Sequence, residues 1–166
     1  MTTTYYLRAE SSSGAPCAAN VAAAGSVTVT VNQPSVAPTA LSGSVNPICS
    51  GTSTILTQTG GSLGTGASWK WYSDASYTTL VGTGVGATAA LTVSPTATTT
   101  YYLRAEGTTS PCTGTIQGPA AGVTITVNQP SVAPASLVAS VATICNGSTT
   151  DLTQTGGSLG TGASWK

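Results

Sequence analysis

The chain has 166 residues, of which only 5% are charged, whereas about 25% are charged in an average soluble protein. Four basic residues cannot form the positive surface that nucleic acid requires, and no apolar run approaches the roughly 20 residues of a membrane helix. We therefore expect neither nucleic-acid binding nor membrane insertion. The net charge is zero and 40% of the residues are hydrophobic, so the chain can bury a core, unlike disordered segments of low hydrophobicity and high net charge.

The sequence repeats itself after 96 residues. The segment TTTYYLRAE occurs at residues 2–10 and again at 98–106. Residues 27–70 and 123–166 are identical at 33 of 44 positions. A unit of this length is one ordinary domain rather than a short solenoid repeat.

This period divides the chain into five parts. We assign residues 1–31 to the last two strands of one repeat, 38–128 to a complete repeat and 135–166 to the first three strands of the next. The linkers, residues 32–37 and 129–134, fall in the motif NQPSVAP. Its two prolines favour an extended, fairly stiff connection.

Both chain ends fall inside repeats, and we expect a longer polypeptide around this segment. The alternative is that the partial repeats of two chains complement each other. That arrangement would lack residues 71–97 at every junction and would leave open sheet edges, so we favour the longer polypeptide.

In chain order, the complete repeat contains seven short segments that are rich in strand-forming residues and separated by Gly- or Pro-containing turns. They are residues 41–45, 53–58, 68–73, 79–81, 89–93, 99–106 and 122–127. Short strands at regular spacing are typical of a β-sandwich. We predict an all-β fold of tandem immunoglobulin-like antiparallel sandwiches, with about seven strands per 96-residue repeat.

The two copies indicate which side chains point inward. Ile55 becomes Asp151 in the next copy, whereas Leu56 remains Leu152. A position that accepts Asp faces solvent, so Leu56 and the residues that alternate with it face the core. The predicted core residues are Leu56, Trp69, Trp71, Tyr101, Leu103, Val123, Ile125 and Val127.

The remaining aromatic residues are candidates for surface contacts. Tyr72, Tyr77 and Tyr102 are predicted to be exposed, and exposed aromatic side chains bind carbohydrate or protein. An ordinary sheet surface is the plainer interpretation. The Gly-rich segment 60–66 has no following GK[ST] and is predicted to be a long hairpin connection or a contact between neighbouring domains.

Catalytic and metal sites are not expected. The chain has no histidine, and no base is available to activate its hydroxyl groups. A calcium site needs several converging oxygens, usually from two or more carboxylates. The complete repeat offers only Asp74 and Glu106. We predict no enzyme activity, no cofactor and no metal.

Each repeat contains one early and one late cysteine. Cys17 and Cys112 occupy equivalent positions, as do Cys49 and Cys145, and none forms a CxxC pair of the zinc-binding kind. This arrangement favours one disulfide per repeat and an oxidising compartment.

Two motifs carry a family resemblance: W-x-W-Y at residues 69–72, and TVSPTATTTYYLRAEG at residues 92–107. With the surrounding order of strands, the chain resembles the immunoglobulin-like repeat of very large secreted surface proteins of Bacteroidetes, which are associated with gliding motility and type IX secretion. The resemblance implies a seven-stranded sandwich in an exported adhesin or surface array, and an extracellular or cell-surface location. It also implies a Cys49–Cys112 disulfide, with Cys17 and Cys145 bonded to cysteines of adjacent repeats.

The functional expectation is a stalk. We predict a structural repeat segment of a secreted adhesin or extracellular filament, whose partners are the neighbouring repeats of the same protein. Low charge and near-identical copies favour this role, because a specific binding site usually makes one copy unlike the next. The alternatives are a carbohydrate- or protein-binding module and a subunit that self-associates laterally into a sheath or fibre.

Overall fold

The computed structural model describes residues 2–9, 21–107, 115–118 and 122–166, and every regular element within these ranges is a β-strand. Consequently, this part of the chain has no helix that could span a membrane. The strands of the complete repeat are β3 (Ala40–Gly43), β4 (Ile48–Cys49), β5 (Thr54–Thr59), β6 (Ala67–Tyr72), β7 (Leu80–Thr83), β8 (Leu91–Val93), β9 (Thr99–Gly107), β10 (Thr115–Gln117), β11 (Val123–Ile125) and β12 (Val127–Asn128).

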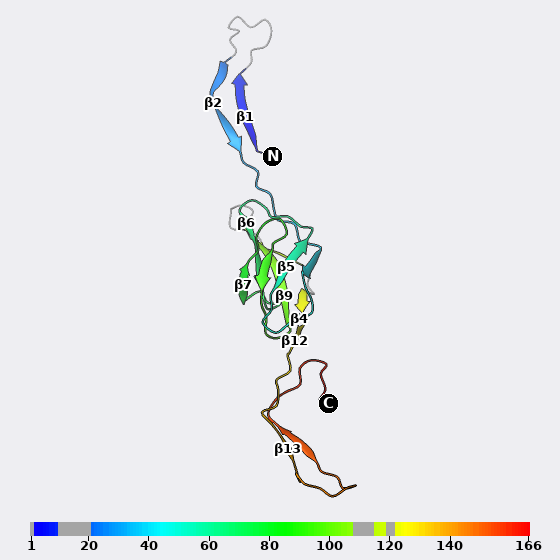
Figure 1. Cartoon of the computed structure of the whole chain (residues 1–166). Coiled ribbons are helices and arrows are strands. Elements are labelled where there is room, and N and C mark those ends of the chain that lie inside the picture. The colour runs from blue at the N-terminus through cyan, green and yellow to red at the C-terminus, as the bar shows by residue number, and fades with distance from the viewer. Residues whose placement is uncertain (1, 10–20, 108–114, 119–121) are drawn as a thin grey trace, which may run out of the picture.

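The complete repeat contains the short parallel strand pair β4-β12 and two antiparallel sheets (Figure 1). One has the strand order β3-β5-β8. The other has the order β10-β9-β6-β7, and β11 also pairs with β9. The fold is therefore the all-β sandwich that the strand pattern predicts.

The alternation of buried and exposed side chains along the strands shows which face of each sheet lies against the core. On β5, Thr54, Leu56 and Gln58 are buried while Ile55 is exposed. This is the period-2 pattern of a strand with one face on a core. The predicted core residues Leu56, Trp69, Trp71, Tyr101, Leu103, Ile125 and Val127 lie together in one buried cluster. Val123 only borders it and is partly buried, because β11 is an edge strand that pairs with β9 alone.

The structure contains more strands than the seven predicted segments. Strands β4 and β10 had no counterpart among them, and the predicted strand 122–127 is divided into β11 and β12. The division occurs because β12 leaves β9 and pairs in parallel with β4. The Asn46 side chain stabilises the point where the chain passes from β11 to β12. It donates to the Thr124 carbonyl and accepts from the Thr126 amide, both at 2.8 Å.

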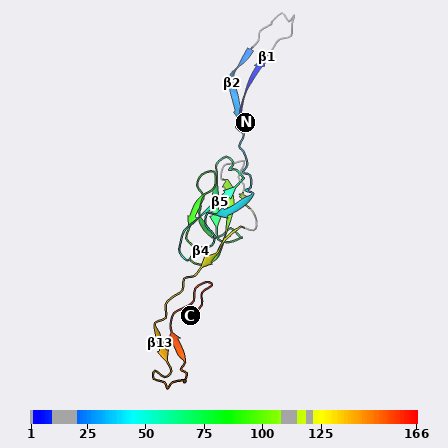
Figure 2. The ribbon, with the colours of Figure 1, turned by 45° about the vertical axis from the view of Figure 1, so that its right-hand side comes forward.

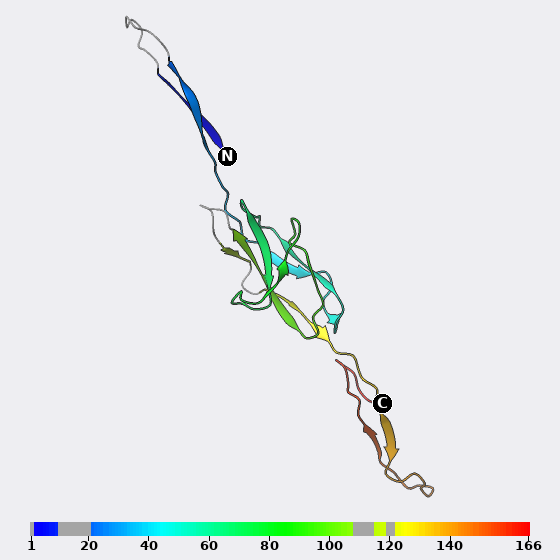
Figure 3. The ribbon, with the colours of Figure 1, turned by 90° about the vertical axis from the view of Figure 1, so that its left-hand side faces the viewer.

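The partial repeats form two hairpins, β1 (Thr3–Ala9) with β2 (Val21–Val29), and β13 (Ser136–Ala139) with β14 (Leu152–Thr155). They lie at opposite ends of the complete repeat in three views of the molecule (Figures 1, 2 and 3). Part of their pairing repeats that of the complete domain after 96 residues: Ser136 pairs with Thr155 as Ala40 pairs with Thr59. Tyr5 pairs with Val27 as Tyr101 pairs with Val123.

Candidate functional sites: the linker clamp and the tyrosine cluster

The linker before the complete repeat is bound to the Gly-rich loop of that repeat. Val36 and Ser62 exchange backbone hydrogen bonds of 2.8 and 3.1 Å. The Thr65 amide donates to the Gln33 carbonyl at 2.9 Å, and the Gln33 amide donates to the Thr65 hydroxyl at 3.0 Å. We call these contacts between residues 33–38 and 60–65 the linker clamp. They fix the linker against the domain that follows it.

Gly64 makes the close approach of the linker clamp feasible. Its amide donates to the Ser35 hydroxyl at 3.0 Å. A Cβ at this position would lie 2.3 Å from the Gln33 carbonyl oxygen, and the neighbouring atoms are also backbone. Any side chain would push the loop away from the linker, so glycine is required by close packing.

The next repeat forms the same clamp. Val132 and Ser158 exchange hydrogen bonds of 2.8 and 3.0 Å, and the Thr161 amide donates to the Gln129 carbonyl at 2.9 Å. A Cβ on Gly160 would again lie 2.3 Å from a glutamine carbonyl oxygen. The clamp therefore recurs in both copies although the second domain is only partly present.

The second candidate site is the tyrosine cluster: Tyr72, Tyr77 and Tyr102 together with Lys70, Arg104 and Glu106. It covers the outer face of β6 and β9, where Lys70 pairs with Arg104 and Ser68 with Glu106. The Arg104 guanidinium lies 4.9 Å from the centroid of the Tyr72 ring and 5.0 Å from that of Tyr77, which are cation–π distances. Three of the four charged side chains of the complete repeat thus gather in one place.

Glu106 is the centre of this network. Its carboxylate accepts from the Lys70 ammonium at 2.6 Å, from Arg104 Nε at 2.9 Å and from the Tyr72 hydroxyl. Burial opposes ionisation of Glu106, but the hydrogen bonds from Lys70, Tyr72 and Arg104 outweigh it and lower the pKa to about 2. Burial, followed by the hydrogen bond to Glu106, raises the pKa of Tyr72. Every charge in the network is paired, so the network holds two strands together and has no free acid or base.

The exposure predicted for Tyr72 is wrong, because its side chain is only 5% exposed. Its ring does point away from the sandwich core, but Arg104 lies over it and Tyr77 packs edge-on at 5.5 Å. Tyr77 and Tyr102 are half-buried, with centroids 6.1 Å apart. Within the tyrosine cluster, Tyr77 and Tyr102 are thus the two tyrosines that are partly exposed to solvent.

Trp69 and Trp71 do not offer a stacking surface, because both are buried in the core. The Trp71 indole donates to the Ala89 carbonyl at 2.7 Å. A hollow of about 350 Å³ lies above Trp69, lined by residues of two loops. The side-chain oxygen of nearby Gln58 is buried and has no hydrogen-bond partner among the described residues.

Asp74 stabilises a turn. Its carboxylate accepts from the amides of Ser76, Thr78 and Thr79, the last at 2.6 Å. These bonds, led by that from Thr79, lower the pKa of Asp74 to about 2. Within the described ranges, no three His, Cys, Asp or Glu side chains gather where they could hold a metal ion.

A match to a family profile identifies the fold. Residues 35–129 match the immunoglobulin-like domain associated with CHU_C. The chain belongs to this family. The match confirms the resemblance on which the sequence prediction rested and the predicted immunoglobulin-like sandwich. No curated protein matches the chain.

Membership of the CHU_C-associated family bears on location and activity. Its domains point to secreted or surface proteins of Bacteroidetes, and they are typically non-enzymatic. The matched residues include part of the first linker clamp and the whole tyrosine cluster. Both features therefore belong to the family domain of this chain.

The disulfide implied for this CHU_C-associated domain stays a prediction. Cys49 and Cys145 are exposed thiols without a partner among the described residues. Cys112, the expected partner of Cys49, lies outside those residues, as does Cys17. Cys49 lies on β4, at the end of the sandwich from which β12 leads into the second linker.

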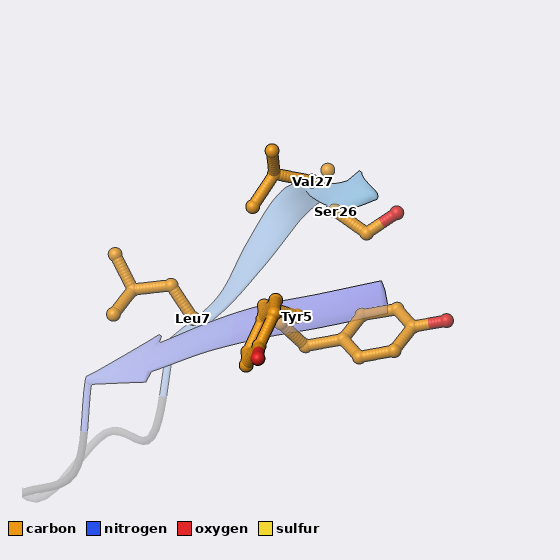
Figure 4. A pocket seen from close by; sticks show the side chains of 6 residues that line it. Tyr5, Leu7, Ser26 and Val27 are labelled. Carbon is orange, nitrogen blue, oxygen red and sulfur yellow. The ribbon is translucent and has the colours of Figure 1, made fainter. Parts of the chain in front are cut away.

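The first hairpin exposes apolar side chains, among them Leu7 and Val27. Tyr5, Tyr6, Leu7, Gly25, Ser26 and Val27 line a shallow hollow of about 420 Å³. Figure 4 shows Leu7 and Val27 projecting from the two strands. Their equivalents in the complete repeat, Leu103 and Val123, pack in or against the core. The hollow is therefore lined in part by side chains whose equivalents in the complete repeat belong to or border the core.

The linker clamp was only partly foreseen from the sequence. The Gly-rich segment was predicted to be a hairpin connection or a contact between domains, without a named partner. One signal was available: NQPSVAP and GGSLGTG are identical in both copies, whereas 10 of the 21 residues between them differ. Two segments that are both unchanged between repeats are candidates for direct contact with each other.

Proposed function

We propose that this chain is a stalk segment of a secreted adhesin or extracellular filament of Bacteroidetes, in which each domain acts as a spacer. The observation that carries the proposal is the linker clamp, which occurs with the same hydrogen bonds in both copies. A linker bound along its length to the next domain cannot act as a free hinge there. Each repeat therefore extends the array by a defined length.

The chemistry of the surface supports a structural role. Three of the four charged side chains of the complete repeat (Lys70, Arg104 and Glu106) pair with one another in the tyrosine cluster. The fourth, Asp74, stabilises a turn. Among the described residues of that domain, no carboxylate is left without partners to act as a base. We propose that the chain is not an enzyme and that its main partners are neighbouring repeats of the same protein.

Small-angle X-ray scattering of the chain tests this proposal. We expect an elongated particle whose mass is independent of concentration. The double variant Gly64→Ala, Gly160→Ala should open both clamps and give a more flexible scattering profile. Gly25→Ala is the matched control, because a Cβ there meets no atom within 4 Å.

Two results would count against a stalk. One is a compact particle in which the hairpins fold back on the central domain. The other is a mass that rises with concentration, which would favour lateral assembly into a sheath or fibre. In the single variant Gly64→Ala, tryptophan fluorescence should be unchanged, since Trp69 and Trp71 belong to the core and Trp165 to the second hairpin.

A binding module is the second candidate function. The half-buried rings of Tyr77 and Tyr102 next to Arg104 favour it, because aromatic side chains stack on sugars. Binding of the chain to a glycan array, lost in Tyr77→Ala and retained in Leu7→Ala, would support this role. Absence of binding would leave the tyrosine cluster as a purely structural network.

A further inference from the structure

The base of the complete repeat holds the beginning of the second linker. The Thr96 carbonyl accepts from the Gln129 side-chain amide at 2.8 Å and from the Ser50 hydroxyl at 3.1 Å. The Ser50 amide donates to the Asn128 carbonyl at 2.9 Å. Two loops of the preceding domain therefore contact the linker at its first residues.

The same glutamine is bound by the domain that follows. The Gln129 amide donates to the Thr161 hydroxyl at 2.9 Å, and its carbonyl accepts from the Thr161 amide at 2.9 Å. The side chain of Gln129 thus bonds to one repeat and its backbone to the next. Pro130 follows directly and restricts the backbone at the joint.

We infer that the base of each repeat is a docking surface for the glutamine of the next linker, and that Gln129 fixes the orientation of two neighbouring repeats. The inference rests on the proposed stalk function and deepens it. The linker clamp alone attaches the linker to one domain, whereas the Gln129–Thr96 bond removes the remaining hinge on the other side. The partner of this surface is the next repeat of the same chain.

Chemistry favours glutamine at this position. Its side chain carries both a donor and an acceptor, and the Thr96 carbonyl needs a donor. In Gln129→Glu the side chain keeps its size but presents only acceptor oxygens when ionised. The bond to Thr96 is then lost, while the backbone bonds to Thr161 remain available.

Distance measurement between paired spin labels tests the inference. We place the labels at Ile55→Cys and Asp151→Cys, equivalent exposed positions in the two repeats, after replacing the four native cysteines by serine. The parent should give one narrow distance distribution. In Gln129→Glu the ratio of docked to undocked joints should fall about fivefold, the effect of one lost hydrogen bond, and a broad component should appear.

Gln33→Glu is the matched control. Gln33 makes the same backbone bonds in the first linker clamp, which lies outside the joint between the two labels. The same charge change there should leave the distribution between the labels narrow. A broadening as large as in Gln129→Glu would contradict a specific role for the Gln129 side chain.

Hydrogen exchange separates this inference from the stalk proposal. The Ser158 and Thr161 amides report on the second clamp, and they should stay protected in both variants. A broad distance distribution in the parent would overturn the docking role of Gln129, and so would an unchanged narrow distribution in Gln129→Glu. The stalk proposal would still stand in either case if the scattering profile remained that of an elongated particle. Unprotected amides in the parent would overturn the docking role as well, because the clamp itself would be absent.

Discussion

The complete repeat and the hairpins on either side of it have nearly the same sequence in two different environments. Leu103 is fully buried in the complete repeat, whereas its equivalent Leu7 is 78% exposed in the first hairpin. Trp69 is 2% exposed and its equivalent Trp165 is 45% exposed. Strand pairing nevertheless keeps the same register in both environments.

The comparison separates two sources of structure. Turn chemistry and alternation set which strands pair and in which register. Burial needs the second sheet, because a two-stranded hairpin alone has nothing to cover its apolar face. Matched substitutions in the two environments therefore measure the contribution of burial at a constant sequence.

The largest contrast is expected for leucine. Leu103→Ala removes a fully buried side chain and should lower the free energy of unfolding by about 2–5 kcal/mol. Leu7→Ala changes an exposed side chain and should alter it by less than about 0.5 kcal/mol. Urea denaturation followed by tryptophan fluorescence measures both. Equal effects would mean that the first hairpin is covered in solution.

A smaller contrast is expected for tryptophan. Trp71→Phe keeps an aromatic ring in the core but leaves the Ala89 carbonyl without its indole donor, which should cost about 1–3 kcal/mol. Trp165→Phe should have little effect on the same transition. If Trp71→Phe and Trp165→Phe unfolded at the same urea concentration, burial would not explain the difference between these two tryptophans.

The tyrosine cluster predicts that the stability of the complete repeat depends on pH. The pKa of Glu106 is lowered to about 2 in the folded domain, below its unfolded value of about 4.3. Its ionised form therefore stabilises the fold above about pH 5, and the contribution is lost as the pH falls towards 2. Asp74 acts in the same direction.

Glu106→Gln should remove part of this acid dependence and lower stability at pH 7 by about 1 kcal/mol. Thermal unfolding from pH 7 to pH 2 measures both effects. Without histidine in the chain, no imidazole titration contributes between pH 5 and 8. An acid limb unchanged in Glu106→Gln would show that the network does not stabilise the fold.

The smallest effect is expected at the outward position of β5. Ile55→Asp introduces the residue that the next copy already carries as Asp151, and both side chains are exposed. The free energy of unfolding should change by less than about 0.5 kcal/mol. A loss comparable to that of Leu103→Ala would reverse the assignment of faces on this strand.

Much of the fold follows from the sequence because alternation is a local property. The replacement of Ile55 by Asp151 was enough to place Leu56 in the core. Tyr72 was misplaced because alternation tells which face a side chain takes but not what covers it. The Gln129–Thr96 bond was not foreseen, because it joins residues 33 positions apart through a carbonyl that has no sequence signal.

The scarcity of charge has a consequence for resistance to proteases. Trypsin-like proteases cut after Lys or Arg, and the complete repeat contains only Lys70 and Arg104. The two residues lie opposite each other on the paired strands β6 and β9, with both side chains held by Glu106. None of the loops of that repeat contains a cleavage point, although exposed loops are where such enzymes normally attack. An array of these repeats can therefore be cut by trypsin-like enzymes only after a whole domain has opened.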